Sequence, residues 1–396
     1  MTNKKKEKNI KFNPKRPLRD QILLVGAPQI VEEDEQDLIN VFKSGWWVNG
    51  PKTKKLAEEF ARYIGCKYAV PVGSGTFALH LSLDILGVGL GDEVITTPYT
   101  FPATAHVIEY VGAKPVFVDI EMGSYNMDPN KVERAITKKT KAIMPIHIAG
   151  RACNMDKILK IARKYHLFVV EDAAHVVEAF WKKRKIGTIS DLTCFSFDVT
   201  KNVAGGLGGM ITTNKKKYYE KLVSFAHFGF TQRNFCLPYD TIYPGYKYDM
   251  SEFCATLALN SLRRVEKNLK LREKYWFEYN EAFKDIPEIV LPNCESDSRH
   301  ARHLYMILLK LEKLKCTREE FMRALASLNI DSRIRFISIH LQTYYRKKYG
   351  YKKGDFPVTE YVSGRVICLP LSPRLTEKDV GDVIKGIKMV INFYRR

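Results

Sequence analysis

Short apolar runs alternate with helix-spaced apolar positions along the first half of the chain. Seven of these runs predict strands, at 68–72, 93–97, 115–119, 142–146, 167–170, 193–197 and 210–212. After Gly75, the residues Leu79, Leu83 and Leu86 recur at helical spacing, and Gly87 ends the pattern. Alternating strands and helices predict an α/β fold with a mostly parallel, seven-stranded sheet covered by helices.

The pattern changes in the second half of the chain. An amphipathic stretch at 251–283 predicts a long helix that connects two domains. A strand is expected at 303–311, a helix opened by a capping box at 317–328, and a last helix from Thr376. We therefore expect a large domain at 21–260 and a smaller α+β domain at 261–396, preceded by a lysine-rich, flexible arm at 1–20.

Length and composition fit this division. A chain of 396 residues is too long for one compact core. We find no apolar run long enough to cross a bilayer and no apolar segment after the lysine-rich start, so we expect a cytoplasmic protein without a membrane partner. The eight cysteines have neither a CxxC nor a zinc spacing, which favours buried thiols and no metal site.

Lys201 is the strongest candidate for chemistry. It follows a predicted core strand and precedes the glycine-rich run at 205–209, which is where a Schiff-base amine should be placed. Asp172 ends another predicted strand. A lysine and a strand-end aspartate suggest pyridoxal 5'-phosphate, with Lys201 holding the aldehyde and Asp172 keeping the pyridine nitrogen protonated.

Several segments make a resemblance specific. Those at 72–80, 97–105, 170–175 and 196–202 occur in the order seen in the DegT/DnrJ/EryC1/StrS family of sugar aminotransferases, and those at 245–252, 303–305, 340–342, 354–357 and 369–371 agree with it. The chain resembles this family from about Ser44 to its C-terminus. The resemblance implies the aspartate aminotransferase fold, type I, and an enzyme that depends on pyridoxal phosphate.

The resemblance also implies a phosphate site. Gly75, Thr76 and Phe77 match the turn whose amides, at a helix N-terminus, bind the cofactor's phosphate. Without the resemblance, such a turn is more often a simple helix cap. Ser196 matches a second hydroxyl donor, although a core serine is its ordinary interpretation.

Other matches concern the cofactor ring and the partner subunit. Phe101 matches an aromatic residue that stacks on the ring, and His175 matches a position near it; both residue types are also ordinary core residues. Lys247 stands where relatives often have an asparagine that reaches the neighbouring subunit's phosphate, which implies a homodimer. Leu207 replaces an acidic residue that most relatives carry.

The formal charge of +20 is the best argument for nucleic acid as a partner. The basic residues are spread along the chain, however, and the denser runs are not joined to a nucleic-acid-binding motif. We expect instead that the basic residues lie on solvent-exposed faces and that their charge attracts anionic, nucleotide-bearing substrates.

The expected activity is transfer of an amino group, by analogy from glutamate, to a keto carbon of a nucleotide-linked deoxysugar. Two alternatives stay open at this point. One is amination of a keto-cyclitol, and the other is a non-catalytic relative with a regulatory role.

Overall fold

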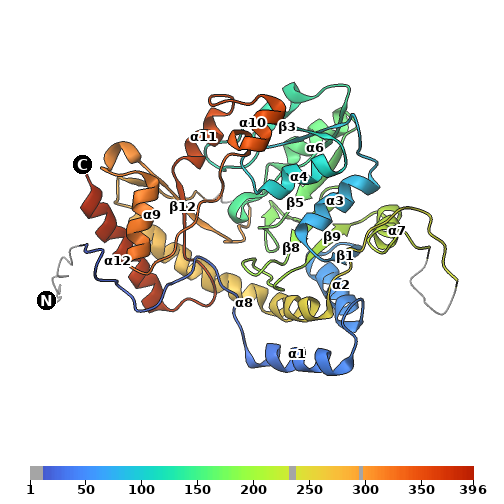
Figure 1. Ribbon diagram of the computed structural model, residues 1–396, viewed down its shortest axis with the longest axis horizontal. Helices are drawn as coiled ribbons and strands as arrows, with labels where there is room; N and C mark the ends of the chain where they lie inside the picture. Colours follow the sequence, from blue (N-terminus) through green and yellow to red (C-terminus); the bar gives the residue numbers. More distant parts are fainter. Residues whose placement is uncertain (1–11, 232–237, 294–297) are drawn as a thin grey trace.

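The computed structural model describes residues 12–231, 238–293 and 298–396. Its large domain is built on a seven-stranded sheet with the strand order β1-β9-β8-β5-β4-β2-β3 (Figure 1). All seven predicted strands are present, with ends that differ by a few residues at most. They are β1 (Tyr68–Val72), β2 (Glu93–Thr96), β3 (Lys114–Phe117), β4 (Thr140–Ile143), β5 (Phe168–Asp172), β8 (Leu192–Ser196) and β9 (Gly209–Thr213). Within this sheet β9 alone runs against the other strands.

Helices cover both faces of this sheet because its central strands are apolar on both sides. Leu79, Leu83 and Leu222 belong to the core on one face, and Phe60, Ile158 and Leu259 belong to the core on the other. The helices of this domain are α1 (Glu32–Ser44), α2 (Pro51–Ile64), α3 (Gly75–Ile85), α4 (Pro102–Tyr110), α5 (Pro129–Val132), α6 (Met155–Lys164) and α7 (Lys216–Phe225). A two-stranded ribbon, β6 (Phe180–Trp181) and β7 (Arg184–Lys185), and 3-10 turns at Glu133–Ala135 and Ile148–Gly150 complete it.

The smaller domain has its own sheet and core. Its strands β10 (Ile289–Val290), β11 (Tyr305–Leu309) and β12 (Val366–Leu369) are antiparallel. Its helices are α9 (Arg318–Ser327), α10 (Thr343–Tyr349), α11 (Pro357–Ser363) and α12 (Glu377–Tyr394), with 3-10 turns at Leu311–Lys313 and Ile339–Leu341. Thr317 and Glu320 form the predicted capping box of α9. Among the described residues, no helix is long and apolar enough to span a membrane.

The helix α8 (Glu252–Phe283) joins the two domains as one continuous element of 32 residues. Its first half buries Leu259 and Val265 in the large domain, and its second half buries Trp276 and Tyr279 in the small one. Figure 1 shows it running between the two bodies. The predicted boundary at residue 260 therefore falls inside a helix that both cores share.

The start of the described chain lies on the small domain. The ring centroid of Phe12 is 5.0 Å from that of Phe393, and Arg19 forms ion pairs of 2.7 and 2.6 Å with Asp379 and Asp382. The first eleven residues of the predicted arm lie outside the described residues. The remaining part, 12–20, contacts α12.

A buried carboxylate ties the two domains together at another point. Asp119 follows β3, and its oxygens accept hydrogen bonds from the amides of Val358 and Thr359 (3.0 and 2.8 Å) and from the Thr359 hydroxyl (2.8 Å). These donors lie in the first turn of α11, where helix geometry leaves amides without an acceptor. Burial alone would raise the pKa of Asp119, but these hydrogen bonds lower it overall.

This contact predicts a pH-dependent loss of stability in Asp119→Asn. The folded pKa is lowered, so the carboxylate's stabilisation is present above the unfolded value near 3.8 and is lost as the pH falls through the folded value. We expect the variant to be less stable at pH 7 by about 1–3 kcal/mol, and the difference to shrink under acidic conditions.

Urea denaturation at a series of pH values measures this difference. Asp285→Asn is the control, because Asp285 is exposed and its replacement should matter by less than about 0.5 kcal/mol. A deficit in Asp119→Asn that stays constant into the acid range would contradict the assignment.

Candidate functional site

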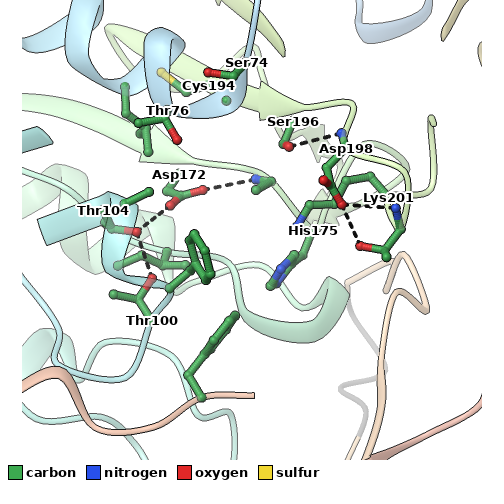
Figure 2. Close-up of a pocket in the computed structure, with 18 of the residues that line it drawn as sticks. Ser74, Thr76, Thr100, Thr104, Asp172, His175, Cys194, Ser196, Asp198 and Lys201 are labelled. Atoms are coloured by element: carbon green, nitrogen blue, oxygen red, sulfur yellow. Dashed lines mark hydrogen bonds between the residues drawn. The ribbon is translucent and has the colours of Figure 1, made fainter. Parts of the chain in front are cut away.

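A cavity of about 400 Å³ lies where β5 and β8 end and where α3 and α4 begin. Seven of the predicted site residues line it, and they are Gly75, Thr76, Phe101, Asp172, His175, Ser196 and Lys201. Figure 2 shows Thr76, Asp172, Ser196 and Lys201 around one open space. Ligands of open α/β sheets bind at this edge, which brings together residues more than 100 positions apart in the chain.

The N-terminus of α3 forms one end of the cavity. Ser74 caps the helix, since its hydroxyl accepts a hydrogen bond from the Phe77 amide at 3.1 Å. The earlier amides, those of Gly75 and Thr76, have no acceptor within the helix. A Cβ atom on Gly75 would lie 2.9 Å from the Cβ of Ser196, so only glycine allows this close approach. The result is a cradle of amides and hydroxyls suited to a phosphate.

Asp172 is a buried carboxylate at the end of β5. Its Oδ2 accepts a hydrogen bond from the Thr104 hydroxyl at 2.8 Å, and its Oδ1 accepts one from the Ala174 amide at 3.2 Å. Burial raises the pKa of Asp172, whereas both hydrogen bonds and the charge of Lys201 act in the opposite direction. An ionised Asp172 is therefore best stabilised by a cation inside the cavity.

The adjacent acid, Glu171, serves another purpose. Neighbouring strand residues face opposite sides of a sheet, so Glu171 points away from the cavity into the core. There its carboxylate accepts hydrogen bonds from Ser190 (2.6 Å) and Thr193 (2.8 Å) and contacts His147 at 2.8 Å. Of the two acids, only Asp172 faces the site.

Lys201 lies in the turn that links β8 to β9. Its own amide donates to the Asp198 carbonyl at 2.9 Å, and its half-buried amine has no hydrogen-bond partner among the residues described. Burial and the positive charge of Arg335 lower the pKa of the amine to about 8, against the opposing charges of Asp172 and Asp198. The amine thus loses its proton closer to neutral pH than an ordinary lysine, which makes it a better nucleophile.

His175 is buried as a neutral ring. Its Nδ1 accepts a hydrogen bond from the Ala149 amide at 3.3 Å, which leaves the proton on Nε2. Burial lowers its pKa well below the ordinary value, and the nearby charges of Lys201 and Arg335 act in the same direction. The ring is parallel to that of Phe336, with an interplanar angle of 4°. A neutral ring in this place can pack or donate one hydrogen bond, but it is unsuited to be the general base.

Two predicted residues lie away from the cavity lining. Phe77 points instead toward Tyr248, and their rings stack with centroids 3.9 Å apart. Its amide donates to the Ser74 hydroxyl, so its backbone takes part in the cap of α3. Lys247 has a 53% exposed side chain whose amine pairs with Asp249 at 2.6 Å. Within a single chain it therefore takes no part in this site.

Sequence reasoning missed other lining residues. Thr100 and Thr104 hydrogen-bond to each other at 2.8 Å, and Thr104 positions Asp172. Both lie in the segment at 97–105 that matches the family, so the threonines of that segment were a usable signal. Arg335 and Phe336 enter from the small domain, and no local pattern marks them. The described part of the chain contains no group of three or more histidines, cysteines or acids that could hold a metal ion.

Comparison with known proteins agrees with this geometry. The chain is 44% identical to MJ1066 of Methanocaldococcus jannaschii, over 95% of its length and 99% of the relative's. It is 41% identical to the spore coat polysaccharide biosynthesis protein SpsC of Bacillus subtilis, over 94% of its length and 98% of the relative's.

Among solved structures, Spr1654 of Streptococcus pneumoniae, assigned as a sugar aminotransferase, superposes in its PLP form with a TM-score of 0.88. The two sequences are 29% identical, and the match covers 94% of this chain and 99% of that one. The same protein has also been solved in a PMP form. The model of the DegT/DnrJ/EryC1/StrS aminotransferase family matches residues 28–388, and the chain belongs to that family.

Proposed function

We propose that the protein is a pyridoxal phosphate-dependent aminotransferase. It would transfer the amino group of glutamate to a keto carbon of a nucleotide-linked deoxysugar. The observation that carries this proposal is the joint placement of Lys201 and Asp172 in one cavity beside an N-terminal helix cradle. The PLP and PMP forms of a structural neighbour support the same cofactor.

The residues present fit this cofactor. Gly75, Thr76 and Ser196 would supply amides and hydroxyls for the phosphate, and Asp172 would pair with a protonated ring nitrogen, a cation that suits its buried carboxylate. Phe101 and His175 supply flat surfaces for the ring. When bound, the cofactor supplies an electron sink for the bond broken at the donor's carbon.

The chain's own residues then have separate tasks. Lys201 would anchor the cofactor and, once its amine is released, would carry the proton between the reacting carbon of the bound substrate and the cofactor in each half of the reaction. Because the pKa of the Lys201 amine is lowered to about 8, a substantial fraction of the amine is neutral near pH 8 and can accept a proton. Asp172 would stabilise positive charge at the ring nitrogen, and the hydrogen bond from Thr104 fixes the orientation of its carboxylate.

The choice of acceptor rests on the relatives and on charge. One close relative is a polysaccharide biosynthesis protein, and the structural neighbour is assigned as a sugar aminotransferase. The net charge of +20 favours attraction of an anionic nucleotide sugar over an uncharged keto-cyclitol. A screen of both substrate classes with glutamate as donor distinguishes them.

A homodimer is part of the proposal. The cavity rim carries Phe101 and Leu207, which are 60% and 62% exposed, and Trp46 on another loop is 58% exposed. Exposed apolar side chains that gather at one rim, as Phe101 and Leu207 do, are typical of an interface. Lys247, which does not line the cavity of its own chain, would reach the phosphate bound by the partner subunit.

Lys201→Ala should lose transamination by at least about 1,000-fold, because it removes both the anchor and the proton carrier. Steady-state assays with glutamate and a keto-sugar nucleotide measure this. Lys185→Met is the matched control, since burial also lowers the pKa of Lys185 to about 8, but it lies outside the cavity. Comparable turnover in Lys201→Ala without added amine would refute the assignment.

Asp172→Asn should bind the cofactor and yet turn over about 100-fold more slowly or worse, because an amide cannot hold the ring's positive charge. Cofactor absorbance and turnover are measured on the same preparation. Near-normal turnover would mean that Asp172 serves only as a structural cap for the amide of Ala174.

Mixing two inactive variants tests the shared site. Lys201→Ala and Lys247→Glu, each confirmed inactive alone, are combined under subunit exchange. A mixed dimer then has one site with both lesions and one with neither, so random exchange should restore roughly a quarter of normal activity. No recovery despite demonstrated exchange, or a fully active monomer, would rule out the shared site.

A further inference from the structure

The segment that carries Lys201 has open space on two sides. Besides the main cavity, a rear cavity of about 30 Å³ lies between this segment, the chain at 26–29 and the helix α8. Thr200 and Lys201 line both cavities. The glycine-rich run at 205–209 follows shortly afterwards, and glycine adds no side chain that could pack. Packing alone therefore does little to fix this segment, although Val203 is buried in the core.

The side chain of Asn202 supplies directional contacts instead. Its Nδ2 donates hydrogen bonds to Glu178 Oε2 and to the Ala301 carbonyl, both at 2.8 Å. Its Oδ1 accepts a hydrogen bond from Nδ1 of His303 at 3.0 Å. Both amide hydrogens and the amide oxygen are thus engaged, so a single orientation of the Asn202 side chain satisfies these partners.

The partners of Asn202 have fixed donor and acceptor roles. Burial lowers the pKa of His303 well below its ordinary value, so the ring is neutral. Its proton lies on Nδ1, because the Asn202 oxygen can only accept. Glu178 is fully buried and forms an ion pair with Arg272, so its carboxylate acts as an acceptor. An exchange of donor for acceptor at Asn202 would therefore conflict with its neighbours.

These partners also come from both domains. Glu178 follows β5 in the large domain, whereas Ala301 and His303 lie in the chain that leads into β11 of the small domain. Arg272, which pairs with Glu178, belongs to the connecting helix α8. The residue next to Lys201 is therefore held at the place where the two domains and their connecting helix meet.

The amine of Lys201 has no comparable support of its own. It makes no hydrogen bond within the described ranges. Burial and the charge of Arg335 lower its pKa to about 8, against the charges of Asp172 and Asp198. A small rotation of the segment would carry the amine toward solvent, because no contact at the amine opposes the movement. The position of the amine thus depends on how its chain neighbours are held.

We propose that Asn202 is a positioning residue for Lys201, because its side-chain amide fixes the segment from which the lysine amine enters the main cavity. Asn202 does not line that cavity, so it acts through Lys201. The inference deepens the proposed aminotransferase function, on which it rests for the role of Lys201. It also makes the placement of the amine depend on how the two domains are joined.

The first test measures Lys201 in the full-length protein after removal of the cofactor. Trace acetylation with acetic anhydride at a series of pH values, with mass spectrometry of the peptide that contains Lys201, gives the pH at which the amine loses its proton. We expect a midpoint near 8 in the unaltered protein. In Asn202→Ala the midpoint should rise by about one pH unit or more, because an amine that moves toward water keeps its proton to higher pH.

The second test measures turnover of the holoenzyme with glutamate and a keto-sugar nucleotide. In Asn202→Ala we expect kcat to fall about 10- to 100-fold, as when a reacting group is displaced by roughly 1 Å. KM for each substrate should change by less than about twofold, because every residue that lines the main cavity is retained.

An exchange of donor and acceptor identifies the contact responsible. Asn202→Asp places a carboxylate against Glu178, so turnover should be at least as low as in Asn202→Ala. Adding Glu178→Gln lets the new amide donate to that carboxylate while its oxygen still accepts from Arg272. We expect the double variant to turn over about three- to tenfold faster than Asn202→Asp, as for one regained hydrogen bond. Recovery stays partial, because the Ala301 carbonyl still lacks its donor.

Asn126→Ala is the matched control. Asn126 is also a buried amide that bridges backbone groups, since it donates to the Arg151 carbonyl at 3.1 Å and accepts from the Ile148 amide at 2.8 Å. It lines neither cavity. Both alanine variants should lose stability toward urea, but Asn126→Ala should leave the Lys201 midpoint and kcat unchanged. If Asn202→Ala does not fold, His303→Phe removes one bond and keeps a ring, and the midpoint should still rise.

Each result supports or overturns the inference. An unchanged Lys201 midpoint in a folded Asn202→Ala would overturn it, and so would an unchanged kcat in an active holoenzyme. Equal loss of stability in both alanine variants, without any change at Lys201, would assign Asn202 to the fold alone. If the unaltered protein catalysed no transamination, the proposed function would be refuted, and the acetylation experiment would still decide whether Asn202 positions Lys201.

Discussion

The site depends on one close approach of backbones. Ser74 and Gly75, at the start of α3, meet Ser196 and Gly209 where β8 and β9 join. A Cβ atom on Gly209 would lie 2.6 Å from the carbonyl carbon of Ser74, so the contact tolerates no side chain. This close approach holds the N-terminal amides of α3 at the edge of the sheet where Asp172 and Lys201 lie. A wider separation would move the amide cradle away from the Lys201 amine.

Part of the cavity wall, at Arg335 and Phe336, comes from the small domain, and several contacts fix the position of that domain. The helix α8 contributes to both cores, and the Asp119 carboxylate holds the first turn of α11. Beneath the site, Glu178 pairs with Arg272 of α8 and accepts a hydrogen bond from Asn202, next to Lys201. The two domains therefore share polar contacts under the cavity as well as around it.

The sequence predicted those parts of the molecule that follow local rules. Seven apolar runs became the seven strands, and because parallel strands end at one edge, Asp172 and Ser196 were expected beside Lys201. Their roles toward a cofactor stay predictions. The sequence analysis did not predict Arg335 as a cavity residue, because its position depends on how the small domain packs against the large one. No local sequence pattern encodes that packing. The amide of Phe77 was expected to bind the phosphate, yet it donates to the Ser74 hydroxyl, and the Phe77 ring stacks on Tyr248.

The reversed direction of β9 has a further consequence for how this chain can vary. Because β9 returns antiparallel to β8, the segment carrying Lys201 is a closed loop and not a crossover through a helix. Hydrogen bonds from the Phe197 amide to the Gly208 carbonyl and from the Gly205 amide to the Phe197 carbonyl close it, both at 2.8 Å. One residue inserted in β9 would turn the following side chains of that strand to the opposite face of the sheet. It would also shift the pairing between β9 and Ser196 of β8. The register of β9 against β8 is thus one feature of this chain that tolerates no insertion.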